Sequence, residues 1–267
     1  MTFKERYGPE ALVAGASKGL GAAFSHALAK EGFNLVIVAR DNEGLKSAAW
    51  ELTNLYPIEV WPVSCDLNDP DATERIQEVI GDRVINFLVY NAARPYIGSF
   101  LDHPVSEHIH ITGVNMLTPL KMVHHFGGQM VKEKRGGIVL MSSLAGNQGA
   151  GFLATYAATK AFNRVLAESL WYEWKTKGVD VIGCIAGSIL TPNFIQSRPE
   201  KINPFAPKPQ LPGEVVKECF SKMGKTPSFI SGGSNKIACF LMNRMYSIKR
   251  AVNLMGDTTR KMYRIGD

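Results

Sequence analysis

Residues 11–30, ALVAGASKGLGAAFSHALAK, join a short apolar run, a glycine-rich turn and an alanine-rich amphipathic segment. This order predicts a strand, a turn and a helix. Gly15, Gly19 and Gly21 carry no side chains, so backbone N–H groups could approach a pyrophosphate at the positive end of the helix. Their spacing, G-x-x-x-G-x-G, differs from the commoner G-x-G-x-x-G fingerprint. The stretch therefore predicts an α/β fold that binds a nucleotide.

A second stretch, SLAGNQGAGFLATYAATK at residues 143–160, ends in a pair suited to acid–base chemistry. Tyr156 and Lys160 stand four residues apart and would share one face of a helix. A fixed cation beside a phenol favours the phenolate and should bring the pKa of Tyr156 toward the working pH. Tyr-x-x-x-Lys also occurs as a solvated surface pair in many helices. Here Ser143 follows an apolar run thirteen residues before Tyr156, which favours a catalytic pair.

These motifs resemble the short-chain dehydrogenase/reductase family, in which a glycine turn, an Asn, a Ser and Tyr-x-x-x-Lys recur in this order and at this spacing. The resemblance covers about residues 10–192 closely and the C-terminal quarter loosely, where it is nearer to steroid-type ketone reductases than to acyl-carrier ketoreductases. It implies reversible hydride transfer between a nicotinamide cofactor and a ketone or secondary alcohol. The catalytic residues that it implies are Asn115, Ser143, Tyr156 and Lys160.

The resemblance also gives each of these residues a role. Tyr156 would protonate the carbonyl oxygen in reduction, and Ser143 would hydrogen-bond that oxygen. Lys160 would bias Tyr156 and hold the ribose hydroxyls, while Asn115 would brace the helix and a water. Taken alone, an Asn in mid-helix would be interpreted as a local backbone hydrogen-bonder.

The end of the second predicted strand, residues 34–39, bears on the choice of cofactor. An acid there binds ribose hydroxyls, whereas a nearby arginine accommodates a 2′-phosphate. Ala39 stands at the acid position and Arg40 follows it, and Lys18 lies in the glycine turn. Two cations and no acid favour NADP(H). Asp41 is the counter-signal, which we interpret as the N-cap of the next helix.

Further cofactor contacts follow from the family resemblance. Asp66 would face the adenine, or act only as a turn residue. Asn91 matches the family, although Tyr90 and Ala93 depart from its usual Asn-Asn-Ala-Gly, and Ala186 replaces a usual proline. The full predicted cofactor set is Gly15, Ser17, Lys18, Gly19, Leu20, Gly21, Arg40, Asp66, Leu67, Asn91, Tyr156, Lys160, Ile189 and Thr191.

Apolar runs alternating with helical segments predict a doubly wound, mostly parallel, seven-stranded Rossmann sheet with helices on both faces. The chain of 267 residues, 45% hydrophobic, suits one domain. We expect a cofactor half at about 8–135 and a catalytic and substrate half at about 136–267. Long helices are predicted over 105–134 and 154–177, and the apolar surface near 113–133 and 154–177 predicts a homodimer or homotetramer.

The predicted substrate region follows the nicotinamide loop. Residues 192–213 contain six prolines and predict a lid without regular helix or sheet, or alternatively a disordered excursion. An apolar pocket would suit a bulky ketone such as a steroid or bile acid, with 3-oxoacyl or small carbonyl compounds as alternatives. Its predicted lining is Leu144, Phe152, Leu153, Ile189, Leu190, Phe194 and Phe205.

Composition excludes several other classes of protein. No secretory signal or membrane-length apolar run is seen, so a cytoplasmic protein without stable membrane insertion is expected. The four cysteines are widely spaced and predict reduced, buried thiols. His103, His108 and His110 with Glu107 could suggest a metal site, but we interpret the histidines as surface residues and predict no metal.

The C-terminal segment carries most of the net charge. Residues 236–267 hold seven Lys and Arg against two Asp and so supply +5 of the formal +6. Such a tail could meet nucleic acid or acidic lipid. A solvated helical face is the preferred interpretation, with no nucleic-acid partner. An NADP-sensing binding protein on the same fold is a non-enzymatic alternative.

Overall fold

The computed structural model describes residues 1–197 and 207–266, and its centre is a sheet of seven strands. The strand order is β3-β2-β1-β4-β5-β6-β7, and all neighbouring strands are parallel. The strand order reverses between β1 and β4, which places the ligand-binding edge at the carboxyl ends of these strands. The predicted doubly wound fold is therefore confirmed. The strands are β1 (Glu10–Ala14), β2 (Asn34–Ala39), β3 (Val60–Ser64), β4 (Phe87–Tyr90), β5 (Gly136–Ser143), β6 (Val179–Ala186) and β7 (Ser228–Ile230).

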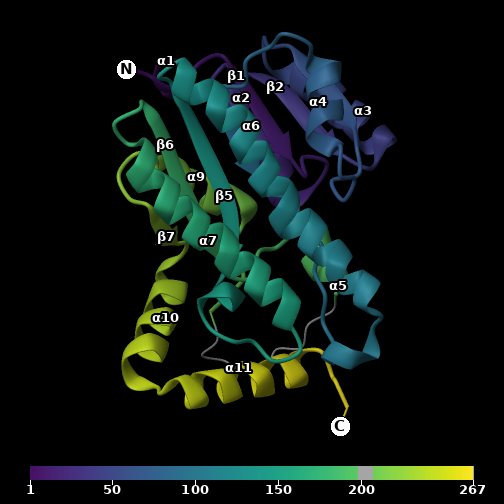
Figure 1. The fold of residues 1–267 in the computed structure, drawn as a ribbon, viewed down its shortest axis with the longest axis vertical. Coiled ribbons are helices and arrows are strands. Elements are labelled where there is room, and N and C mark those ends of the chain that lie inside the picture. The colour runs from purple at the N-terminus through teal and green to yellow at the C-terminus, as the bar shows by residue number, and fades with distance from the viewer. Residues whose placement is uncertain (198–206, 267) are drawn as a thin grey trace.

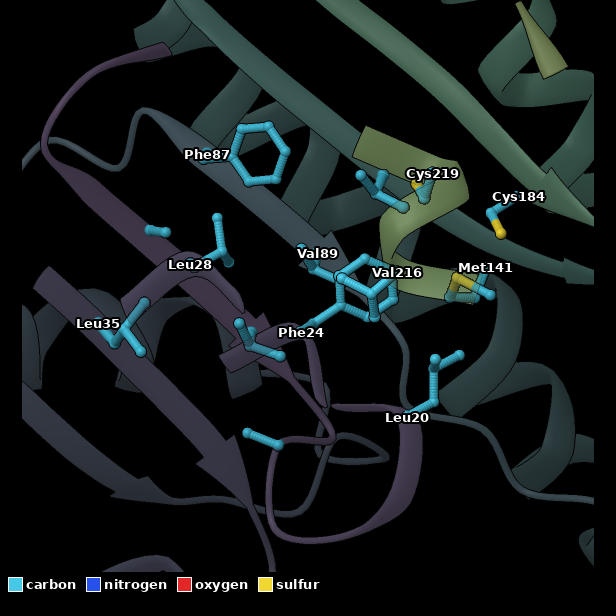
Figure 2. Close-up of a cluster of buried hydrophobic side chains, with 14 of the residues drawn as sticks. Leu20, Phe24, Leu28, Leu35, Phe87, Val89, Met141, Cys184, Val216 and Cys219 are labelled. Atoms are coloured by element: carbon cyan, nitrogen blue, oxygen red, sulfur yellow. The ribbon is translucent and has the colours of Figure 1, made fainter. Parts of the chain in front are cut away.

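Helices cover both faces of the sheet (Figure 1). On one face lie α1 (Phe3–Tyr7), α2 (Gly19–Lys30), α3 (Asn42–Leu55) and α9 (Pro212–Lys222), and on the other α4 (Ala72–Ile80), α6 (Thr118–Lys132) and α7 (Ala154–Trp174). Alternate residues of β1 point to opposite layers, so Val13 packs with the first group and Leu12 with the second. The side chains of both layers are buried, and Figure 2 shows part of the first layer, with Phe24, Val89 and Val216 close together. This burial explains why the strands read as continuous apolar runs.

The chain from 105 to 132 is helical throughout, as the sequence predicted, but it contains one wider turn. It consists of α5 (Val105–Thr112), a π-helical turn at Gly113–Leu117 and α6. Asn115 lies in the π-helical turn, and its side chain bonds the main chain of Arg94 instead of pointing to solvent. Wider helical turns of this kind are frequent at functional sites. The sequence did not predict the wider turn, because Asn115 makes these hydrogen bonds with a distant loop.

The segment after β6 begins with regular structure. Helix α8 covers Pro192–Gln196, with Thr191 Oγ1 accepting the Phe194 N–H at 3.3 Å. A proline is tolerated in the first turn of a helix because its missing N–H would be unpaired there anyway. The prediction that 192–213 lacks helix is therefore wrong at this end. Phe205 lies outside the described residues.

The C-terminal helices extend the molecule below the sheet (Figure 1). Helix α10 (Gly233–Met245) leads away from β7, and α11 (Ile248–Met262) turns back along the start of α7. Met255 of α11 packs against Ala150 and Ala157. Among the described residues, no helix has both the length and the apolar character needed to cross a membrane. The four cysteines are buried and unpaired, as predicted.

Candidate active site

A cavity of about 940 Å³ lies at the carboxyl ends of the parallel strands. Most of the predicted cofactor residues line it, whereas Gly21 and Lys160 lie behind its wall. The predicted residues in the lining are Gly15, Ser17, Lys18, Gly19, Leu20, Arg40, Asp66, Leu67, Asn91, Tyr156, Ile189 and Thr191. One cavity therefore brings together the glycine turn, the strand ends and the phenol.

The glycine turn presents bare backbone to this cavity at the start of α2. Gly15 and Gly19 have φ values of +82° and +61°, a region that residues with a side chain rarely adopt. A Cβ on Gly21 would lie 1.9 Å from the Gly15 carbonyl oxygen. Asn91 Nδ2 donates to the same oxygen at 3.1 Å and so braces the turn from the end of β4. The turn fits a pyrophosphate held by N–H groups at a helix N-terminus.

The end of β2 supplies positive charge beside this turn. Lys18 and Arg40 line the cavity, and Ala39 stands where an acid would bind a ribose. Asp41 caps α3 by accepting the Gly44 N–H at 3.0 Å, as predicted, and its other oxygen lies 3.6 Å from Lys18 Nζ. The Asp41 carboxylate is thus shared between a helix cap and a lysine. These residues fit a dinucleotide cofactor.

Ser143, Tyr156 and Lys160 meet where β5 ends and α7 begins. Tyr156 lines the cavity and shares a side-chain hydrogen bond with Ser143. Lys160 is buried, donates to the Met141 carbonyl oxygen at 3.1 Å, and has its Nζ 5.7 Å from the centre of the Tyr156 ring. The helical spacing of the two residues therefore does place them side by side.

Burial dominates the electrostatics of this pair. It raises the pKa of Tyr156, and the hydrogen bond with Ser143 lowers that pKa in part. Burial also lowers the pKa of Lys160 to about 8. The expected lowering of the Tyr156 pKa by Lys160 is therefore wrong for the protein alone, because desolvation outweighs a cation directed at Met141. At neutral pH Tyr156 keeps its proton and can act as a donor.

Asn115 connects the π-helical turn to this centre. Among the described residues, no hydrogen bond joins Asn115 to Lys160. Its side chain is fully buried and donates to Thr159 Oγ1 at 3.2 Å. Thr159 Oγ1 in turn donates to the Tyr156 carbonyl oxygen at 2.8 Å. Asn115 therefore positions the first turn of α7, which carries the phenol.

The sequence suggested two roles for Asp66, a contact with the adenine or a turn residue. Its carboxylate accepts the Asn68 N–H at 2.9 Å, as a turn residue does, and Asp66 also lines the cavity. A contact with a bound cofactor and a turn are thus compatible at this position.

The substrate end of the cavity differs from the predicted apolar lining. Ile189 and Phe194 do line it, but Leu144, Phe152, Leu153 and Leu190 do not. The Phe152 ring lies under the Arg260 guanidinium, Leu153 packs against the Ala145 cluster, and Leu190 is 42% exposed. Leu144, Phe152 and Leu153 follow Ser143 closely in the sequence, but none of them lines the cavity.

Residues that the sequence argument missed take their place. They come from the loop after β4, from α5 with the residues on either side of it, from the residue after α8 and from the turn after α11. For the residues of the loop after β4, the position at a strand end was a signal in the sequence, since ligands gather at such ends. They are Arg94, Pro95, Tyr96, Ile97, His103, Glu107, His110, Val114, Ser197 and Tyr263.

The histidines near α5 form no metal centre. His108 is buried, not on the surface as predicted, with Nδ1 2.8 Å from Thr155 Oγ1 and Nε2 2.9 Å from the Phe100 carbonyl oxygen. Glu107 pairs with Arg94 at 2.8 Å. Within residues 1–197 and 207–266, no group of three or more His, Cys, Asp or Glu could hold a metal ion.

The loop at Ile189 is held by main-chain contacts with Gln210. The Gln210 N–H donates to the Ser188 carbonyl oxygen at 3.0 Å, and the Leu190 N–H donates to the Gln210 carbonyl oxygen at 2.9 Å. These bonds join the loop just before the segment predicted as a lid, residues 192–213, to a residue near the end of that segment. The cavity wall at Ile189 is thus tied to a residue two positions before α9.

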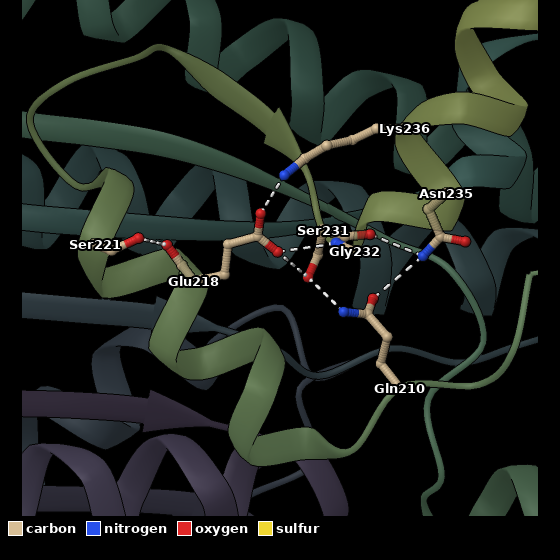
Figure 3. A network of polar contacts seen from close by, with 7 residues as sticks. All are labelled: Gln210, Glu218, Ser221, Ser231, Gly232, Asn235 and Lys236. Carbon is tan, nitrogen blue, oxygen red and sulfur yellow. Dashed lines mark hydrogen bonds and ion pairs between the residues drawn. The ribbon is translucent and has the colours of Figure 1, made fainter.

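A polar network fixes Gln210 in turn (Figure 3). Gln210 Nε2 donates to Ser231 Oγ at 3.2 Å, and Gln210 Oε1 accepts from Asn235 Nδ2 at 3.2 Å. Ser231 Oγ donates to Glu218 at 3.0 Å, and Glu218 also pairs with Lys236. The network anchors the loop to α9, β7 and α10.

Comparisons with known proteins agree with this geometry. Residues 9–202 match the family model of the short chain dehydrogenases. A 7beta-hydroxysteroid dehydrogenase of Mediterraneibacter gnavus is 35% identical over 241 residues, which is 88% of this chain and 90% of the relative. A very-long-chain 3-oxoacyl-CoA reductase of Laccaria bicolor is 30% identical over 83% of this chain and 65% of the relative. A structure solved in work on 7beta-hydroxysteroid dehydrogenase stereoselectivity superposes with a TM-score of 0.89 at 30% identity, covering 96% of this chain and 99% of its own.

Proposed function

This chain belongs to the short-chain dehydrogenase/reductase family, and from that premise we propose that it interconverts a ketone and a secondary alcohol with NADP(H) on a bulky, largely apolar substrate of the hydroxysteroid or bile-acid type. One observation carries the proposal. The protonated Tyr156 phenol, bonded with Ser143, lines the same cavity as the glycine turn. A proton donor and a dinucleotide cradle in one cavity are what carbonyl reduction requires.

The residues divide the work as follows. Tyr156 gives its proton to the carbonyl oxygen in reduction and takes it back in oxidation. Ser143 donates a hydrogen bond to the same oxygen, which stabilises the charge that develops there. Lys160, from its contact with Met141, holds positive charge behind the phenol, and Asn115 positions α7. When bound, the cofactor supplies the hydride.

The preference for NADP(H) rests on Lys18 and Arg40. Both cations line the cavity beside the glycine turn, and Ala39 offers no carboxylate to ribose hydroxyls. Asp41 also lines the cavity, but its carboxylate is engaged by the α3 cap and by Lys18, which offsets its negative charge. These contacts support a 2′-phosphate in this region.

The substrate class is supported by the cavity and by the relatives. Ile97, Val114 and Phe194 give the cavity apolar surface, and the relatives named 7beta-hydroxysteroid dehydrogenase are similar over nearly the whole chain. The 3-oxoacyl-CoA reductase relative supports a second candidate, reduction of a long-chain 3-oxoacyl compound. Both candidates use the same catalytic residues.

A substrate panel tests the proposal. Purified protein with NADPH or NADH is offered oxo-steroids, oxo-bile acids, 3-oxoacyl thioesters and small ketones, and oxidation of the cofactor is followed by absorbance. The proposal expects the highest kcat/KM with NADPH and a steroid-type ketone. A best rate with the thioesters would favour the second candidate. NADPH binding without turnover of any ketone would favour a sensing protein.

We also propose a homodimer or homotetramer and a cytoplasmic location. Leu120 of α6 and Val165 and Tyr172 of α7 are 42%, 49% and 67% exposed, which supports pairing through these helices. Light scattering at micromolar concentration tests the assembly, and a monomeric mass would contradict it. Cell fractionation tests the location.

A further inference from the structure

We propose that Arg94, Glu107 and His110 form a polar subsite at the substrate end of the cavity, which binds a neutral hydroxyl group of the substrate remote from the reacting carbonyl. The inference rests on the proposed function and names a feature of its substrate. It assigns work to residues that the catalytic scheme does not use.

The first observation is an ion pair that lines the cavity. Arg94 Nη2 lies 2.8 Å from Glu107 Oε2, and the two side chains are 33% and 36% exposed. The pair is thus partly withdrawn from water and still open to a ligand. Each side chain retains hydrogen-bonding capacity beyond this single contact, since a guanidinium has five donor hydrogens and a carboxylate has two oxygens.

The second observation is an unsatisfied ring nitrogen. His110 follows Glu107 by three residues on α5, so the two side chains share a face of the helix, and both line the cavity. His110 Nε2 is buried and has no hydrogen-bond partner among the described residues. A buried polar atom without a partner is costly, and such atoms in native proteins call for an explanation. A small rotation of the ring toward a ligand hydroxyl in the cavity would satisfy it.

The subsite is held at a fixed place relative to the reacting phenol. The Arg94 main chain makes two hydrogen bonds with Asn115, and Asn115 bonds Thr159 one turn from Tyr156. A second link comes from α5 itself, because His108 bonds Thr155, the residue before Tyr156. A substrate held at both points would therefore present its carbonyl at a defined position, which is how remote binding supports catalysis.

Charge decides which polar group fits. The Arg94 guanidinium, through its hydrogen bond, lowers the pKa of Glu107, so the pair carries opposite charges at neutral pH and sums to zero. A hydroxyl can donate to Glu107 and accept from Arg94 at once. A carboxylate can only accept, and it would lie beside the Glu107 carboxylate. The subsite thus favours a neutral hydroxyl over an anion.

Matched ligands test this directly. Binding to the NADPH-loaded protein is measured by calorimetry at pH 8 for two ring ketones that differ only in one hydroxyl on a remote ring. The expected result is about tenfold tighter binding of the hydroxylated ketone, as expected for a hydrogen bond to a charged group. Glu107→Gln and His110→Leu should each bring this ratio toward one. Glu43→Gln, at an exposed carboxylate paired with Lys46 on α3, is the matched control and should keep the wild-type ratio.

Several outcomes overturn the proposal. Equal affinity of the wild type for both ketones removes its basis, and so does an equal loss by Glu107→Gln on both ligands, which would reveal a purely structural role. A further comparison uses ring ketones that carry a carboxylate and the methyl esters of the same ketones. If neutralising a ligand carboxylate weakens binding tenfold and Arg94→Met abolishes that difference, the site binds anions instead. The measured quantity is affinity, so the subsite and the proposed function can fail separately. If the hydroxylated ketone binds more tightly but no ketone is turned over, the proposed function is contradicted and the subsite is supported.

Discussion

Asn115 and Arg94 are joined by two reciprocal hydrogen bonds. The Arg94 N–H donates to Asn115 Oδ1 at 2.8 Å, and Asn115 Nδ2 donates to the Arg94 carbonyl oxygen at 3.0 Å. An amide side chain thus pairs with a main chain as a neighbouring strand would, and it joins the loop after β4 to the π-helical turn. The same Asn115 amide donates to Thr159 on α7, so one buried side chain couples three segments around the cavity.

Replacing Asn115 tests this coupling. Asn115→Leu leaves the Arg94 N–H and carbonyl without partners in a partly buried place, so we expect a loss of about 1 kcal/mol per orphaned group in the free energy of unfolding, the low end of the penalty for buried groups. Catalysis should fall at least tenfold because Tyr156 loses its support. Urea unfolding and steady-state kinetics measure the two effects. Thr159→Val breaks only the link from Asn115 to α7 and keeps both Arg94 bonds, so it should cost less stability, and the reverse order would contradict the assignment.

Removal of the Tyr156 hydroxyl tests the proton donor. Tyr156→Phe deletes one polar group and little surface, so turnover should fall by at least about a hundredfold while NADPH affinity stays near the wild-type value. Stopped-flow kinetics and a fluorescence titration of NADPH give the two numbers. Activity retained within tenfold would mean that another group supplies the proton.

Exchange of the β2 end tests the cofactor preference. Ala39→Asp combined with Arg40→Ser introduces a ribose acceptor and removes a phosphate partner, so the ratio of kcat/KM for NADPH over NADH should reverse. Arg40→Ser alone should lower this ratio without raising activity on NADH. Equal use of both cofactors by the wild type would refute the Lys18 and Arg40 argument.

The charged form of Lys160 should lower the free energy of unfolding. Its pKa in the folded protein is about 8, below the ordinary value near 10.4, so the unfolded chain binds its proton more tightly. Lys160→Met should therefore stabilise the protein by up to about 3 kcal/mol below pH 8, and the gain should fade as the pH rises toward about 10.5. Denaturant unfolding at pH 7 and pH 10 measures it. The exposed Lys46→Met is the control, and an Lys160→Met gain that did not depend on pH would show that desolvation of the ammonium is not its cause.

Phe194 should act on binding more than on chemistry. It is an aromatic residue of α8 that lines the cavity, and burying such a side chain is worth about 1.5–3 kcal/mol. Phe194→Ala should raise KM about tenfold for a bulky apolar ketone, with a smaller change in kcat. Small ketones provide the comparison, because they should show little change. An unchanged KM for every bulky substrate would place α8 outside the binding site.

The sequence by itself determined the sheet and the position of the reacting groups along it. Strands buried on both faces read as apolar runs, and a turn with glycines at 15, 19 and 21 admits few alternatives to a strand followed by a helix. Tyr156 and Lys160 are neighbours because of helical geometry alone, and Asp41 caps α3 by a local hydrogen bond. All of these features depend on residues close together in the chain.

Tertiary structure decided what depends on distant residues. The π-helical turn at Asn115 requires Arg94, and the burial that raises the pKa of Tyr156 above its usual range comes from several elements at once. The substrate lining was predicted from residues near Ser143, but side chains from α5 and from the turn after α11 line the cavity instead. No pattern in the sequence reports which way Leu144 or Tyr263 points, because packing between remote segments sets that direction.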